Sequence, residues 1–143
     1  MNKVTKSLAL ERCYKGNASL TPQRLLVLET VGRQKKPISA YGIRDILDGK
    51  ENPLNIATIY RVLEFWCELK MVHRLAALHK YVCCTDPKEK HTHIINCCQK
   101  CETTYESCNK EMGMDLERGP ESLGLKFAND SHLEIPVICL SCS

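Results

Sequence analysis

Cysteine and histidine residues are concentrated between residues 83 and 108, which hold six of the ten cysteines and two of the five histidines of this 143-residue chain. Within this stretch Cys98 and Cys101 form a CxxC pair, and Cys139 and Cys142 form a second one about forty residues later. Zinc favours tetrahedral coordination by thiolates, and each CxxC turn can direct two sulfurs toward one ion. The spacing therefore predicts a structural zinc site with four thiolate ligands.

Three other uses of these cysteines fit the sequence less well. Disulfides need an oxidising compartment, but no apolar segment follows a basic N-terminal one, so we expect a cytoplasmic protein with reduced thiols. A thioredoxin-like CxxC needs a βαβ context, which is missing around residues 98–101. A zinc deaminase site built on His132 and Glu134 would need a P-C-x-x-C element, and the sequence has none.

The two halves of the chain differ in charge. Residues 1–82 carry fourteen Lys and Arg against seven Asp and Glu, a net charge of +7, whereas residues 83–143 carry six against ten, a net charge of −4. A basic half joined to an acidic, cysteine-rich half indicates that the first half contacts a polyanion such as DNA. No apolar run has the length of a transmembrane helix, so a soluble protein is expected.

The elements before residue 84 follow the order of a winged helix. Thr21, Ser39 and Asn55 are expected to cap helices, because their side chains can accept hydrogen bonds from free N–H groups. Apolar periodicity predicts helices over 3–15, 22–32, the three turns after Ser39, and 56–69, followed by strands over 72–75 and 80–84. Three or four short helices followed by a hairpin predict a winged helix-turn-helix.

Such a fold would place the helix over 56–69 in the major groove of double-stranded DNA. Arg61 is expected to contact DNA because it has no acidic residue four positions on. Tyr60 has an equal chance of packing against the protein, and which side chains reach bases stays open. The expected DNA contacts on this helix are Thr58, Tyr60 and Arg61, and the expected phosphate contacts elsewhere are Lys35, Lys36, Arg44 and the wing residue Arg74.

The second half is expected to form a small α/β domain, which gives the whole chain an α+β fold. Polar residues 85–90 include Pro87 and predict a hinge, so the boundaries are 1–84 for the winged helix and 91–143 for the second domain. Strands are expected over 93–97, 103–106 and 131–138, with a helix between them that is broken or short because of Gly119 and Pro120. About sixty residues form a small core, so this domain should depend on its zinc.

Several segments together resemble the ferric uptake regulator (Fur) family, and most closely its zinc-sensing branch, the zinc uptake regulators (Zur). The resemblance covers residues 19–142, and its motifs are LTPQRLLVLE, ISAYGIRDIL, ATIYRVLEF, MVHR, YVCC, the histidines near residue 91 and the two CxxC pairs. Membership implies a homodimeric, metal-dependent DNA-binding repressor with an N-terminal winged helix and a C-terminal dimerisation domain. It also implies that Cys98, Cys101, Cys139 and Cys142 hold the structural zinc.

The resemblance further implies a regulatory zinc site, which would join the two domains across the hinge. Its ligands would be two imidazoles, one thiolate and one carboxylate: His73, Cys84, His91 and Glu106. Such a set suits zinc, whereas an iron or peroxide sensor would use only nitrogen and oxygen. Cys83 and Cys97 would replace Cys84 and Cys98 if the register shifted by one residue. Other family members suggest a second exposed site that includes His93 and His132.

The expected function is therefore that of a zinc-responsive transcriptional repressor. With one structural and one regulatory Zn²⁺ per chain, a homodimer would bind a palindromic operator and control zinc-uptake genes. The alternatives are an iron- or peroxide-sensing Fur-family regulator, a constitutive winged-helix adaptor that contains only structural zinc, and a zinc-stabilised thiol enzyme. No base stands beside a nucleophile in the sequence pattern, so an enzyme is not expected.

Overall fold

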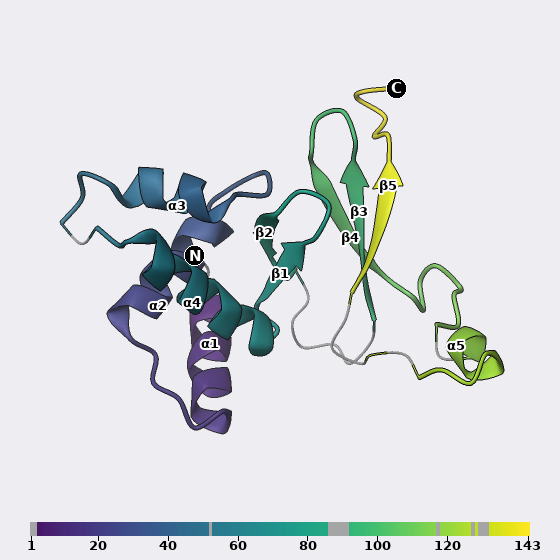
Figure 1. Cartoon of the computed structure of the whole chain (residues 1–143), viewed down its shortest axis with the longest axis horizontal. Coiled ribbons are helices and arrows are strands. Elements are labelled where there is room, and N and C mark those ends of the chain that lie inside the picture. Colours follow the sequence, from purple (N-terminus) through teal and green to yellow (C-terminus); the bar gives the residue numbers. More distant parts are fainter. Residues whose placement is uncertain (1–2, 52, 86–91, 117, 127, 129–131) are drawn as a thin grey trace. The chain divides into compact units, whose positions relative to one another are not determined.

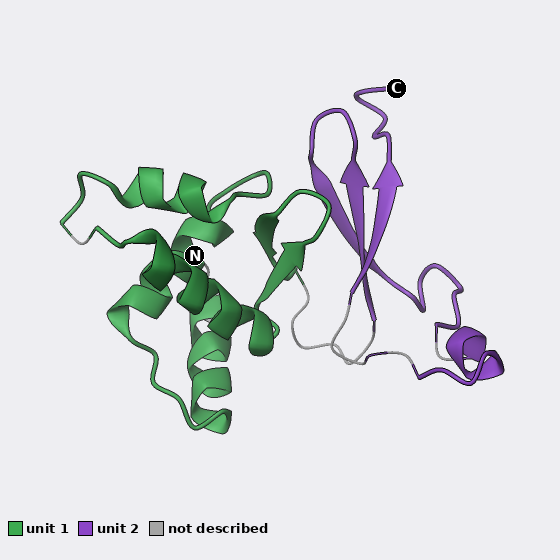
Figure 2. Ribbon diagram, viewed as in Figure 1, with its two compact units in different colours: residues 1–87 green, residues 88–143 purple. Residues whose placement is uncertain are grey.

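The chain forms two compact units, Met1–Pro87 (unit 1) and Lys88–Ser143 (unit 2), as Figure 2 shows. The structure is a computed structural model, and it describes residues 3–51, 53–85, 92–116, 118–126, 128 and 132–143. The expected hinge lies outside the described residues except for Thr85.

Unit 1 is a winged helix-turn-helix, which confirms the predicted fold class (Figure 1). The two strands pair antiparallel as the wing, with His73 opposite Val82, and a single bridge joins Ile38 to Tyr81 beside them. The elements are α1 (Lys3–Lys15), α2 (Pro22–Gly32), α3 (Ala40–Leu47), α4 (Ile56–Glu68), β1 (Val72–Leu75) and β2 (Lys80–Cys83).

Side-chain caps fix where three of these helices begin. Thr21, Ser39 and Asn55 each have extended backbone angles and accept a hydrogen bond from the backbone N–H three residues on, at 3.3, 3.0 and 2.8 Å. Each cap satisfies a donor that has no partner within the helix, which stabilises a helix start by about 1 kcal/mol. The predicted starts of α2, α3 and α4 are thereby confirmed.

The core of unit 1 lies between the helices and the wing. Trp66 is fully buried, and its indole N–H donates to the backbone oxygen of Arg24 at 2.8 Å, which ties α4 to α2. The buried apolar cluster consists of Leu8, Ala9, Cys13, Val27, Leu28, Val31, Ala40, Ile43, Leu47, Leu54, Ile59, Val62, Leu63, Trp66, Met71, Val72 and Tyr81.

Unit 2 contains a three-stranded sheet with the order β4-β3-β5. Its strands are β3 (His93–Cys98), β4 (Thr104–Cys108) and β5 (Leu133–Val137); β3 pairs antiparallel with β4 and parallel with β5. Because β3 and β5 run in the same direction, the segments that follow them emerge at the same end of the sheet (Figure 1). These segments carry the two CxxC pairs, which we name the first knuckle (residues 98–101) and the second knuckle (residues 139–142).

Helix α5 (Arg118–Ser122) is short, as expected, but the prediction that Gly119 and Pro120 interrupt it is wrong. Pro120 is the third residue of the helix, where a backbone N–H has no intrahelical acceptor, so proline is tolerated. The Asp115 carboxylate accepts from the N–H of Arg118 at 3.0 Å at the start of the helix. The helix stops before Gly124, whose φ of +71° suits a residue without a Cβ.

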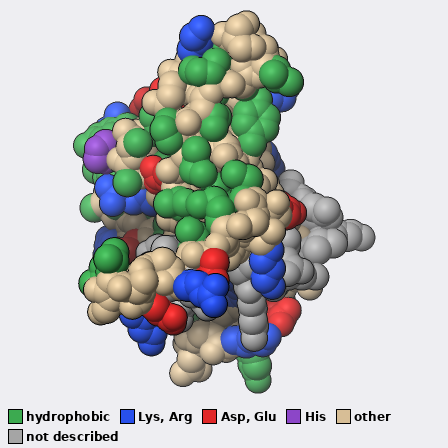
Figure 3. Space-filling model, turned by 90° about the vertical axis from the view of Figure 1, so that its right-hand side faces the viewer, with side chains coloured by type: hydrophobic (Ala, Val, Ile, Leu, Met, Phe, Trp, Pro, Cys, Tyr) green, Lys and Arg blue, Asp and Glu red, His purple; other side chains and the backbone are tan. Residues whose placement is uncertain are grey.

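Among the described residues, unit 2 buries few apolar side chains and exposes many. Its buried members are Ile94, Ile95, Cys97, Cys98 and Cys108. Hydrophobic side chains gather on the face of the molecule drawn in Figure 3, and the large ones that unit 2 exposes are Tyr105, Met112, Leu123, Leu125, Ile138 and Leu140. No helix in the described part of the chain is long and apolar enough to cross a membrane.

Candidate metal centre and nucleic-acid interface

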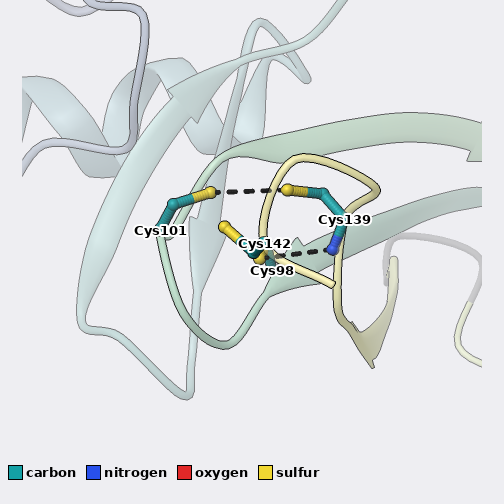
Figure 4. Close-up of side chains that lie close together, drawn as sticks. All are labelled: Cys98, Cys101, Cys139 and Cys142. Atoms are coloured by element: carbon teal, nitrogen blue, oxygen red, sulfur yellow. Dashed lines mark hydrogen bonds between the residues drawn. The ribbon is translucent and has the colours of Figure 1, made fainter.

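The two knuckles of unit 2 bring four sulfur atoms together (Figure 4). The Sγ atoms of Cys98, Cys101, Cys139 and Cys142 all lie within 4.8 Å of one another, and none of these cysteines is in a disulfide. The Sγ atoms of Cys101 and Cys139, one from each knuckle, are 3.8 Å apart. In a tetrahedral ZnS₄ centre with Zn–S bonds of 2.3 Å, adjacent sulfurs lie about 3.8 Å apart. The donor set and its spacing therefore fit zinc.

Hydrogen bonds from the chain favour the thiolate form of the first knuckle. The backbone N–H of Cys139 donates to Cys98 Sγ at 3.4 Å, and this bond, followed by those from Cys101 and Lys100, lowers the pKa of Cys98 to about 6. A hydrogen bond with the Thr103 hydroxyl is the main cause of the lowered pKa of Cys101, whose Sγ lies 3.2 Å from Thr103 Oγ1. Thiolates are the form that binds zinc.

Cys142 of the second knuckle holds its proton more firmly. Hydrogen bonds with the Cys139 and Cys101 side chains raise the pKa of Cys142 to about 12. Zinc binding would release this proton, because all four sulfurs must be ionised as ligands.

Two of the predicted regulatory ligands lie together in unit 1. His73 of β1 is 9% exposed, and its ligand nitrogen lies within 4.8 Å of the Sγ of Cys84, the residue that follows β2. Cys83 takes a different direction, since its Sγ contacts the backbone oxygen of Leu28 in α2 at 3.8 Å and burial raises its pKa to about 11. The geometry thus favours Cys84 over Cys83 as a ligand.

Unit 2 contains two His–Glu pairs. His93 Nδ1 lies 2.5 Å from Glu106 Oε1, and His132 Nε2 lies 3.0 Å from Glu134 Oε1. Ile95 pairs with both Glu106 and Glu134 across the sheet, so the two carboxylates share one face. Unit 2 thus pairs each histidine of the predicted second site, His93 and His132, with a carboxylate. His91, a predicted ligand of the regulatory site, lies outside the described residues.

In unit 1 the exposed face of α4 carries the predicted reading residues. Ile59, Val62 and Leu63 point into the core, which leaves Tyr60 and Arg61 exposed and Thr58 partly exposed. Tyr60 packs edge-on against Tyr41 of α3, with 6.4 Å between ring centroids, and its side chain stays 44% exposed. Among the described residues Arg61 makes no ion pair.

The predicted phosphate contacts are exposed at several places on unit 1. Lys35 and Lys36 lie in the loop between α2 and α3. Arg44 is held by Asp45 at 3.2 Å and lies over the Tyr41 ring, 5.1 Å from its centroid. The Arg74 guanidinium lies 3.5 Å from His79 Nδ1 in the wing. All four cations are accessible to a polyanion.

Three hydroxyl-bearing residues near these sites were not predicted from the sequence. Tyr41 contacts Tyr60, Thr103 contacts Cys101, and hydrogen bonding to the Cys139 side chain raises the pKa of Tyr105. Of the three, only the role of Thr103 could have been suspected from the sequence, because Thr103 lies two residues after the knuckle cysteine Cys101. The two tyrosine contacts join residues far apart in sequence and depend on the tertiary fold.

Comparison with known proteins gives one family. The model of the ferric uptake regulator family matches residues 15–135. The zinc uptake regulation protein of Escherichia coli (strain K12) is 36% identical over 131 residues, which cover 91% of this chain and 76% of the relative. The zinc uptake regulation protein of Shigella flexneri matches to the same extent.

Solved structures agree with the sequence comparison. A zinc uptake regulator complexed with zinc and DNA matches with a TM-score of 0.82 and 28% identity, covering 99% of this chain and 96% of that one. The crystal structure of holo XcZur matches with a TM-score of 0.81 and 25% identity, covering 99% and 98%.

Proposed function

Since the chain belongs to the ferric uptake regulator family, we propose that it is a zinc-responsive transcriptional repressor. It binds palindromic operator DNA as a homodimer when regulatory zinc is bound, and it thereby controls zinc-uptake genes. Support comes from the relatives named zinc uptake regulation proteins and from the similar regulator solved with zinc and DNA.

Unit 1 is the DNA-binding unit of this proposal. The exposed face of α4 enters the major groove, where Arg61 contacts bases or phosphates. Lys35, Lys36, Arg44 and Arg74 contact phosphates, which fix the orientation of the helix without reading sequence. Arg61 is available for this role because no carboxylate of the described residues pairs with it.

One observation favours zinc over iron as the regulatory metal. The Cys84 thiol lies beside the His73 imidazole, with ligand atoms within 4.8 Å of each other. A thiolate with an imidazole suits zinc, whereas iron sensing would need only nitrogen and oxygen ligands. Glu106 supplies the carboxylate of the set, and His91 supplies the second imidazole. His93 is the alternative imidazole, because it already contacts Glu106.

Unit 2 is the dimerisation unit, and it holds a second, structural zinc ion on its four cysteines. Its exposed apolar side chains, among them Leu123 and Leu125, support an interface with a second copy, because monomers rarely expose so many. This gives two zinc ions per chain. A bound regulatory ion would link ligands of both units. The α4 helices of the two subunits would then have the spacing that matches successive turns of the operator.

The test is operator binding with a choice of metal. Operators are selected from a random duplex library with zinc-loaded protein, and their affinity is then measured with zinc, with ferrous iron and after mild chelation. Zinc should tighten binding, and Cys84→Ala should abolish this effect while one zinc per chain remains on the four cysteines. Cys83→Ala is the matched control and should keep the zinc response. Equal binding without zinc would contradict the proposal.

Two histidine variants assign the remaining ligand. His91→Ala should remove the zinc response if the family pattern holds in this chain, and His93→Ala should leave it in place. The opposite result would assign the position to His93. By linkage, operator DNA should tighten zinc binding by the same factor as zinc tightens DNA binding.

We propose a regulatory and not an enzymatic role, and a cytoplasmic location where the protein meets DNA. Burial raises the pKa of Cys13, Cys67 and Cys83, so at neutral pH these thiols are poor nucleophiles. Turnover of a thiol or disulfide substrate would contradict this role.

A further inference from the structure

The hydroxyl group of Thr103, at one edge of the sheet, reaches the four-cysteine cluster. Thr103 directly precedes β4 and Tyr105 is the second residue of that strand. Because side chains alternate along extended backbone, Thr103 and Tyr105 share one side and Thr104 points to the other. Thr104 is opposite Cys97, which is not a knuckle cysteine.

The Thr103 hydroxyl meets the first knuckle. Thr103 Oγ1 lies 3.2 Å from the Sγ of Cys101. That sulfur lies 3.8 Å from the Sγ of Cys139 in the second knuckle. The hydroxyl thus contacts a sulfur that belongs to the centre of the four-cysteine cluster.

The direction of the hydrogen bond between Thr103 and Cys101 follows from the chemistry of a zinc-bound sulfur. A zinc-bound cysteine is a thiolate and carries no hydrogen, so it can only accept. A hydroxyl group can rotate to donate, and a donor to a charged acceptor forms a stronger bond than a neutral pair. Partners of this kind orient metal ligands and commonly change metal affinity 10- to 100-fold when they are removed.

We propose that Thr103 is a positioning residue of the structural zinc site, whose hydroxyl donates to the Cys101 thiolate and slows the loss of zinc. This inference rests on the four-cysteine zinc site of the proposed function.

The experiment measures zinc transfer to a chromogenic chelator from the full-length protein. Thr103→Val, which removes the hydroxyl and keeps the shape, should release zinc about 10-fold faster. Thr103→Ser restores the hydroxyl and should return the rate to near that of the wild type. The matched control Thr104→Val, whose hydroxyl lies on the other side of the strand, should leave the rate unchanged.

A spectroscopic measurement separates donation to sulfur from a general loss of stability. In cobalt-substituted protein, loss of a donor raises the energy of the sulfur electrons, so the sulfur-to-cobalt charge-transfer band should move to longer wavelength in Thr103→Val and return in Thr103→Ser. An unmoved band, a wild-type release rate in Thr103→Val, or equal acceleration in Thr103→Ser would overturn the inference. If Cys98→Ser removed no zinc from the protein, the four-cysteine site itself would fail, and the inference with it.

Discussion

Removal of the structural zinc should unfold unit 2 and leave unit 1 folded. Cys98→Ser is the sharpest perturbation, because Cys98 is fully buried and ends the central strand β3. Full burial of Ile94 and Ile95, the two fully buried large apolar side chains of this sheet, contributes about 3–6 kcal/mol together. A structural zinc site contributes on the order of 10 kcal/mol, which exceeds the contribution of the two isoleucines. Unit 2 without zinc should therefore have no stable fold.

Unit 1 provides the internal comparison. Among the described residues its core contains seventeen buried apolar side chains, including Trp66 and Ile59, and none of the four cysteines of the zinc site lies in it. In hydrogen exchange measured by mass spectrometry, Cys98→Ser should lose the protection of β3 and β4 while α2 and α4 keep theirs. The neighbouring Cys97→Ala is the control, which should keep its zinc and its protected strands.

The result that would refute this reasoning is a folded sheet without metal. If elemental analysis found no zinc in Cys98→Ser and the β3 amides were still protected, the side chains of unit 2 would be sufficient to stabilise it.

Three further predictions concern unit 1. Arg61→Ala should weaken operator binding by about 1–3 kcal/mol in fluorescence anisotropy, whereas Glu64→Ala on the same exposed face should not weaken it. Ile59→Ala should lower the free energy of unfolding by about 2–5 kcal/mol in urea denaturation followed by tryptophan fluorescence, because Ile59 is fully buried. Burial raises the pKa of Cys67 to about 11, so the unfolded chain ionises near pH 9 while the folded chain keeps its proton. Stability from this thiol is full below pH 9 and is lost toward pH 11, by on the order of 1 kcal/mol given its partial exposure, and Cys67→Ala should lose less over that interval.

Local chemistry explains why unit 1 could be predicted from sequence. Thr21, Ser39 and Asn55 cap their helices through bonds to residues three positions away, and such contacts can be recognised in a short segment. The four-cysteine grouping was predictable for a related reason, since each knuckle is local and zinc needs both.

The bounds of α5 were harder to predict, because its neighbouring apolar residues are not buried in the described structure. Met112, Leu123 and Leu125 are 47, 76 and 60% exposed. Short helices are marginal without packing, so five residues are helical here. The effect of Cys139 on the pKa of Tyr105 was equally hidden, because it depends on the parallel pairing of β3 and β5.

The parallel pairing of β3 and β5 also affects the biosynthesis of the metal centre. When β3 and β4 leave the ribosome, the nascent chain carries only the first knuckle. The second knuckle is made about forty residues later, which takes about 2–8 s at ordinary rates of translation. During that interval the nascent chain offers an ion two sulfurs in place of four, and it captures zinc durably only once β5 has joined the sheet.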